Sequence, residues 1–161
     1  MKMKTNIICI VFLFAAVFSF AQKKNVTDAA MLMKKYSPMA GPEKAKETAS
    51  KAKKFIDLAA VNAETKEDVK MHLYRGMVYF ALIEVAQFDA MSGKAPDEAL
   101  LEEYKDISME SFTKVLNDPK GKYVQDAERF IGSRVTQYFN MGLGMYEKKN
   151  FEMAFMSFAG A

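Results

Sequence analysis

The chain has 161 residues, of which 23 are lysine or arginine and 20 are aspartate or glutamate, giving a formal net charge of +3. Nothing in this near balance indicates the one-signed surface that a nucleic-acid binder shows, so we expect no nucleic-acid partner. With one cysteine, Cys9, and one histidine, His72, the chain also has too few ligands for a zinc-type site and no pair of thiols for a disulfide. We therefore expect neither a metal nor a cofactor.

Residues 1–21 have the pattern of a secretory signal peptide, which is removed from the mature protein. Lys2 and Lys4 precede an apolar run of 14 residues from Ile7 to Phe20, and small residues lie just before Gln22. As a helix this run would span about 21 Å, less than the roughly 30 Å hydrocarbon core, so we do not expect an uncleaved anchor. The mature chain, 22–161, has 21 basic and 20 acidic residues and no stable membrane span. We expect it in the periplasm or at the exterior of a bacterial cell.

Apolar residues at helical offsets of three and four recur along the mature chain, whereas strand patterns are nearly absent. The first predicted helix covers residues 26–36. The second covers residues 42–59, where alanines form one stripe and lysines fill the rest of the circumference, a pattern typical of one buried and one solvated face. The third covers residues 66–90, and Gly93 is its predicted left-handed stop.

The fourth predicted helix covers residues 96–116 and opens with Pro96 followed by two acids, an order that favours a helix start. The fifth covers residues 124–148, and the sixth begins near Asn150 and continues to Ala161. Because the intervening loops are short, the helices should pair as three consecutive antiparallel hairpins. The predicted fold class is all-α.

The last predicted hairpin carries large and small residues at fixed helical positions. Its first helix has Tyr138, Met141, Gly142 and Met145, and its second has Phe151, Ala154, Phe158 and Ala161. This set resembles a tetratricopeptide repeat, in which both helices pack through such residues. The resemblance implies that the chain is an irregular α-solenoid of stacked antiparallel hairpins, with these residues packing within the repeat.

An earlier hairpin resembles the same repeat more weakly. Gly76 and Tyr79 match the glycine and aromatic positions of its first helix, and Ser108, Phe112 and Val115 take positions in its second helix. Alanines 45, 49 and 52 form a fainter copy still. The two matching glycines lie 66 residues apart instead of one 34-residue period, so lengthened helices are expected. Glycine inside a helix costs about 1 kcal/mol relative to alanine, and close helix packing would explain Gly76 and Gly142, although it offers no account of Gly132.

The C-terminal residue Ala161 lies inside a helical stripe, without a cap or a polar ending. Repeat arrays normally close with a helix whose outer face is polar. We therefore expect residues 22–161 to be a helical-repeat domain that is truncated at its C-terminus.

Catalytic signals are weak along the whole chain. The paired acids, Asp97 with Glu98 and Glu102 with Glu103, are sequence neighbours that point in different directions, and no phosphate-binding glycine loop is present. His72 occupies an aromatic position of the middle repeat, where a structural role is expected. We do not expect an enzyme.

The resemblance implies instead a partner surface on the first helix of each repeat. Its side chains would be Leu73, Met77 and Phe80 in the middle repeat, and Phe139, Leu143 and Tyr146 in the last. Neighbouring helices could also cover this apolar stripe, an alternative that the sequence leaves open. We interpret the chain as a secreted or periplasmic scaffold for protein–protein interaction with an unidentified protein or peptide. The alternatives are an envelope module that binds a small molecule or glycan, and an adaptor part of a larger enzyme or anchored protein.

Overall fold

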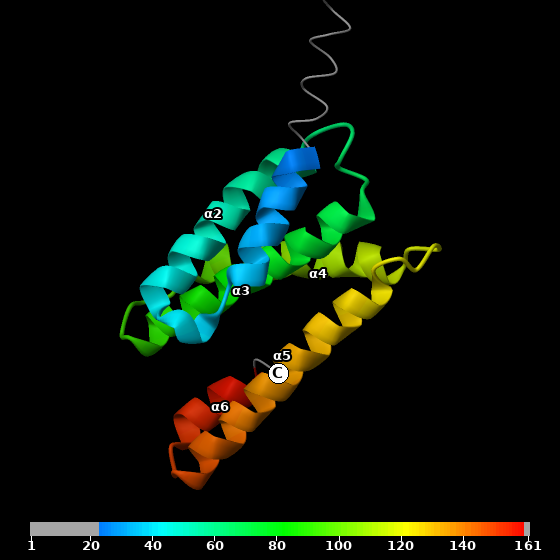
Figure 1. Cartoon of the computed structure of the whole chain (residues 1–161). Helices are drawn as coiled ribbons and strands as arrows, with labels where there is room; N and C mark the ends of the chain where they lie inside the picture. Colours follow the sequence, from blue (N-terminus) through cyan, green and yellow to red (C-terminus); the bar gives the residue numbers. More distant parts are fainter. Residues whose placement is uncertain (1–22, 160–161) are drawn as a thin grey trace, which may run out of the picture.

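The computed structural model describes residues 23–159, apart from the side chains of residues 39, 91, 152, 156 and 159. All regular structure in this range is helical, which confirms the all-α fold class (Figure 1). The elements are a helix over residues 23–35, the 3-10 turn η1 (Pro38–Ala40), α2 (Pro42–Ala60), α3 (Val69–Met91), α4 (Glu98–Leu116), α5 (Val124–Glu147) and α6 (Phe151–Ala159). The predicted signal peptide, 1–21, and the predicted packing residue Ala161 lie outside the described residues.

The helix boundaries follow local capping chemistry. α3 begins later than predicted because the Asp68 side chain accepts a hydrogen bond from the Lys70 backbone N–H at 2.9 Å, which caps the helix there. The preceding turn is fixed by Thr65, whose buried hydroxyl donates to the Ala59 carbonyl at 2.6 Å. α4 begins in the same way, since Asp97 accepts from the Leu100 N–H at 3.0 Å.

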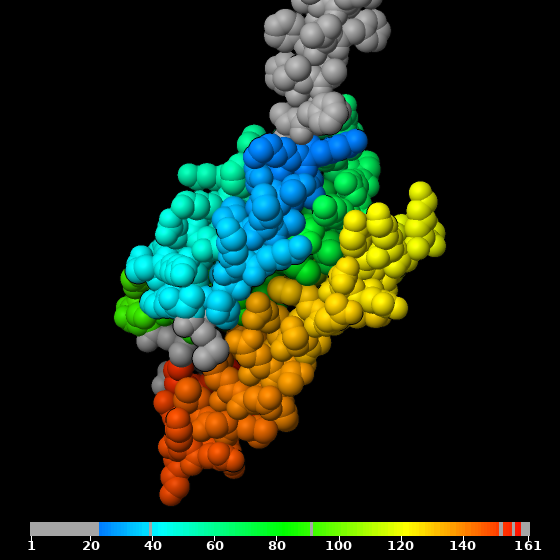
Figure 2. All heavy atoms as spheres, viewed as in Figure 1, coloured from blue at the N-terminus to red at the C-terminus, as the bar shows by residue number. Residues whose placement is uncertain are grey.

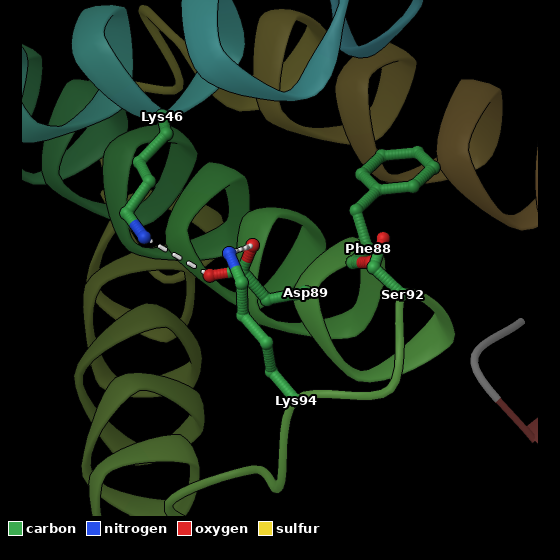
Figure 3. Close-up of polar contacts among 5 residues, drawn as sticks. All are labelled: Lys46, Phe88, Asp89, Ser92 and Lys94. Atoms are coloured by element: carbon green, nitrogen blue, oxygen red, sulfur yellow. Dashed lines mark hydrogen bonds and ion pairs between the residues drawn. The ribbon is translucent and has the colours of Figure 1, made fainter.

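The end of α3 is tied to α2 and to the following loop through Asp89. Figure 3 shows Lys46 of α2 and Lys94 of the loop on the two oxygens of this carboxylate, at Nζ–Oδ2 and Nζ–Oδ1 distances of 3.0 and 2.8 Å. The hydrogen bonds from Lys94 and Lys46 lower the pKa of Asp89. The Ser92 hydroxyl closes the last turn by donating to the Phe88 carbonyl. These contacts fix where the chain leaves α3 toward α4.

The main core lies between the helix over residues 23–35, α2 and α3. The predicted alanine stripe of α2 is buried, and its small side chains let the neighbouring helices approach closely. α3 is the central element, with α2 packed on one side and α4 on another. It is buried on nearly its whole circumference along residues 81–85, which accounts for its nearly uninterrupted apolar sequence.

The hairpin of α5 and α6 is joined to this body less extensively. Residues of α5 between Ala127 and Tyr138 contact α3 and α4, whereas the C-terminal part of α5 packs against α6. Of the labelled helices, α6 packs only against α5. Figure 1 shows α5 running past the body, and Figure 2 shows its end extending beyond the other helices together with α6. The hairpins are therefore not stacked evenly along the chain.

Candidate binding surfaces

Two glycines place a helix backbone against a phenyl ring in the two C-terminal hairpins. A Cβ atom added to Gly76 of α3 would lie 2.9 Å from ring atoms of Phe112 on α4. A Cβ atom added to Gly142 of α5 would lie 2.5 Å from the ring of Phe158 on α6. The Ser108 hydroxyl also donates to the Gly76 carbonyl at 3.0 Å. Both hairpins thus use a glycine and a phenylalanine at the positions that the sequence singles out for packing.

The remaining predicted packing residues divide into two groups. Tyr79 and Ala154 are buried, and Tyr79 also meets the ring of Tyr104 edge-on at a centroid distance of 5.5 Å. Phe151 and Phe158 keep much of their surface exposed. α6 therefore buries its small side chain against α5 and leaves large aromatic side chains in solvent.

The prediction that Leu73 belongs to an open partner surface is wrong. Its side chain is only 2% exposed and packs in a core with Phe112, Val115 and Ala127. Met77 and Phe80 on the same helix are half-buried. The cause is α5, which crosses this face of α3. In the middle hairpin, therefore, a neighbouring helix covers the apolar stripe, which is the alternative that the sequence left open.

The other three predicted partner residues, Phe139, Leu143 and Tyr146, are exposed on the far half of α5. They repeat at offsets of four and three, which places them on one face of the helix. α6 carries Phe151, Phe155 and Phe158 at the same offsets. The sequence analysis missed Phe155, which is 74% exposed, although its offset from Phe151 was a usable signal.

The two stripes lie side by side in antiparallel order. Phe139 contacts Phe158 at a centroid distance of 5.7 Å, and Tyr146 contacts Phe151 at 5.5 Å. Leu143 and Phe155 are the middle members of their stripes, between these two contacts. The six side chains form one surface that we call the aromatic end: Phe139, Leu143, Tyr146, Phe151, Phe155 and Phe158.

A buried polar cluster holds α5 against α3. Glu84 of α3 is 1% exposed and lies 3.5 Å from a guanidinium nitrogen of Arg134 on α5. Burial raises the pKa of Glu84, while the Arg134 charge opposes this shift. One turn further along the two helices, the Tyr138 hydroxyl of α5 donates to Oε1 of Gln87 on α3 at 2.8 Å. The sequence signal for this cluster is a single acid, Glu84, inside the apolar middle of α3.

A groove of about 600 Å³ lies between the helix over residues 23–35, α3 and α5. Its apolar lining includes Leu73 and Met77 from α3 and Phe130 from α5. Its charged lining consists of Lys34, Asp126, Arg129 and Arg134. The sequence analysis did not anticipate this groove, because its walls come from three helices that are distant in the chain.

Candidate metal ligands lie apart from one another in the part of the chain that the structure describes. Among residues 23–159, no three histidine, cysteine, aspartate or glutamate side chains gather where they could hold a metal ion. His72 is buried, and burial together with the nearby charges of Lys114 and Arg75 lowers its pKa. No helix in this described part of the chain is long and apolar enough to cross a membrane.

A scan against protein-family models finds no match for the chain, and searches of curated proteins and of solved structures find no significant match. The resemblance to tetratricopeptide repeats therefore depends on the sequence of this chain alone.

Proposed function

We propose that the chain is a secreted or periplasmic scaffold that binds a partner protein through the aromatic end. The observation that carries this proposal is the set of six apolar side chains exposed side by side on α5 and α6. A contiguous exposed apolar surface of this kind marks an interaction site in a folded protein. Aromatic side chains also supply much of the binding energy at protein interfaces.

The middle hairpin suggests what kind of structure the partner presents. Phe112, which faces Gly76, is only 7% exposed because Phe130 of α5 stacks on it at a centroid distance of 5.6 Å. Phe158, which faces Gly142 in the same way, is 37% exposed. Among the labelled helices, none beyond α5 packs against α6. We propose that a partner helix packs on the aromatic end much as α5 packs on the middle hairpin.

The proposal can be tested by site-specific photocrosslinking. A benzoyl-phenylalanine replaces Phe155 at the centre of the aromatic end, and a matched control replaces Val61, another highly exposed apolar residue, in the turn after α2. We expect a crosslinked partner from position 155 in envelope extracts and none from position 61. Identical products from both positions, or no product from position 155, would count against the aromatic end as the binding site.

The captured partner then has to bind the purified mature chain. Phe155→Glu should weaken binding at least about tenfold, because a charge replaces an aromatic side chain at the centre of the contact. Val61→Glu should leave the affinity unchanged. Light scattering of the mature chain alone would show whether the captured partner is a second copy, and a stable dimer that depends on Phe155 would refute a heterologous partner.

A further inference from the structure

We propose that the groove between the helix over residues 23–35, α3 and α5 binds an apolar small molecule that carries one anionic group. The groove is separate from the aromatic end, since it lies on the opposite half of α5. Its volume of about 600 Å³ falls in the usual range for small-molecule sites, about 300–1,000 Å³. This inference does not depend on the proposed protein partner.

The walls of the groove suit an apolar ligand. Met77 and Phe130 are half-buried and contribute apolar surface, and Met33 adds a second thioether from the helix over residues 23–35. Methionine side chains are flexible and polarisable, so they adapt to ligands of different shapes. Tyr74 lines the same groove, and its hydroxyl makes no hydrogen bond to the part of the chain that the structure describes.

The charges around the groove favour an anion. Three cations line it, while Asp126 is the one lining acid and Glu84 lies buried behind Arg134. Asp126 is paired with Arg129 at 3.5 Å, and Glu84 is paired with Arg134 at 3.5 Å. Lys34 is exposed and makes no ion pair within residues 23–159. One positive charge is therefore left over, and it lies on the groove wall.

The smaller groove on the other side of α5 provides a comparison. It has a volume of about 300 Å³ and is lined by apolar side chains such as Phe80, Met109 and Ile131. Its lining cation is again Arg134, whose charge is paired with Glu84. This smaller groove therefore lacks an unpaired cation, so an anion is matched better by the larger of these two grooves.

Two fluorescent dyes with the same aromatic skeleton can separate the contribution of the apolar walls from that of the positive charge. Anilinonaphthalene sulfonate is an apolar monoanion, and N-phenylnaphthylamine is its uncharged counterpart. We expect the mature protein to bind both dyes at one shared site and decanoate to displace them. Lys34→Gln should weaken binding of the sulfonate about fivefold, as for loss of one exposed ion pair, and leave binding of the neutral dye unchanged.

Three variants serve as controls for the location of the dye-binding site. Lys35→Gln removes an exposed charge next to Lys34 but outside the groove lining, and should change neither affinity. Ser133→Phe places a ring in the groove and should weaken both dyes. Phe155→Glu should have no effect on either dye.

Two results would overturn the proposal. One is unchanged sulfonate affinity in Lys34→Gln, and the other is loss of dye binding in Phe155→Glu, which would place the dye at the aromatic end. Circular dichroism of each variant checks that the helical fold is retained.

Discussion

Substituting Gly76 by alanine tests whether the contact between α3 and α4 requires a residue without a side chain. The added Cβ would lie 2.9 Å from two ring atoms of Phe112, closer than carbon atoms pack in folded proteins. The ring has little room to move, because Phe112 is buried and stacks on Phe130. The two helices must therefore separate slightly, or the stacked rings must shift together.

The expected magnitude follows from two opposing effects. Alanine is favoured over glycine inside a helix by about 1 kcal/mol. Overpacking a well-packed site costs about 1–3 kcal/mol. Because the Phe112 ring is confined, we expect the upper half of that range and a net destabilisation by Gly76→Ala of about 1–2 kcal/mol.

Gly132→Ala is the matched control in α5, where an added Cβ would meet nothing within 4 Å. Only the helix preference remains at this position, so Gly132→Ala should stabilise the protein by about 0.5–1 kcal/mol. Gly142→Ala should fall between the two. Its Cβ would lie only 2.5 Å from the Phe158 ring, but this ring is partly exposed and can turn toward solvent.

Urea unfolding followed by circular dichroism measures all three free energies of unfolding under the same conditions. The expected order of stability is Gly132→Ala above Gly142→Ala above Gly76→Ala. If Gly76→Ala matched Gly132→Ala, the close approach of α3 and α4 would not be limited by the missing side chain, and the packing argument would fail.

Three further substitutions probe the polar groups of the core. Tyr138→Phe removes the hydrogen bond to Gln87 and should cost about 1 kcal/mol in urea unfolding; an unchanged stability would show that water replaces this bond fully. His72 has a pKa below its ordinary 6.5 in the folded protein, so the unfolded chain binds more protons and stability is lost as the pH falls from 6.5 through the folded value. His72→Phe should remove that loss, which urea midpoints at pH 7.5 and 5.5 would detect. Glu84 has a pKa above its ordinary 4.5, so the folded state holds the proton more tightly and stability falls as the pH rises through that window. Glu84→Gln should flatten this part of the profile, and an identical profile in both proteins would contradict the assignment.

The helices were predictable because each boundary is set by residues close in sequence. Pro42 at the start of α2 and Asp97 before α4 act within one helical turn of themselves. Gly93, with φ of 86°, adopts the left-handed conformation that its predicted role as a helix stop requires. The start of α3 was predicted too early because Thr65 folds back onto the Ala59 carbonyl, a contact that spacing does not reveal.

The surfaces were harder to predict because they depend on which helix covers which. Leu73 and Phe139 occupy corresponding positions in two similar hairpins, three residues before Gly76 and Gly142, yet Leu73 is buried and Phe139 is exposed. The difference lies in the path of α5, which packs on α3 through residues far away in sequence. The Glu84–Arg134 pair that helps to hold this path spans 50 positions of the chain. Periodicity identifies an apolar stripe but not the element that covers it.

The length of α5 explains why this helix covers the apolar face of α3 and also carries the exposed aromatic end. With 24 residues it spans about 36 Å, whereas the nine described residues of α6 span about 14 Å. The described part of α6 packs along only part of α5, while the first half of α5 lies across α3 and α4. The excess spacing between Gly76 and Gly142 falls partly in this first half. The added length buries Leu73, forms one wall of the charged groove through Phe130 and Arg134, and carries the aromatic end away from the body.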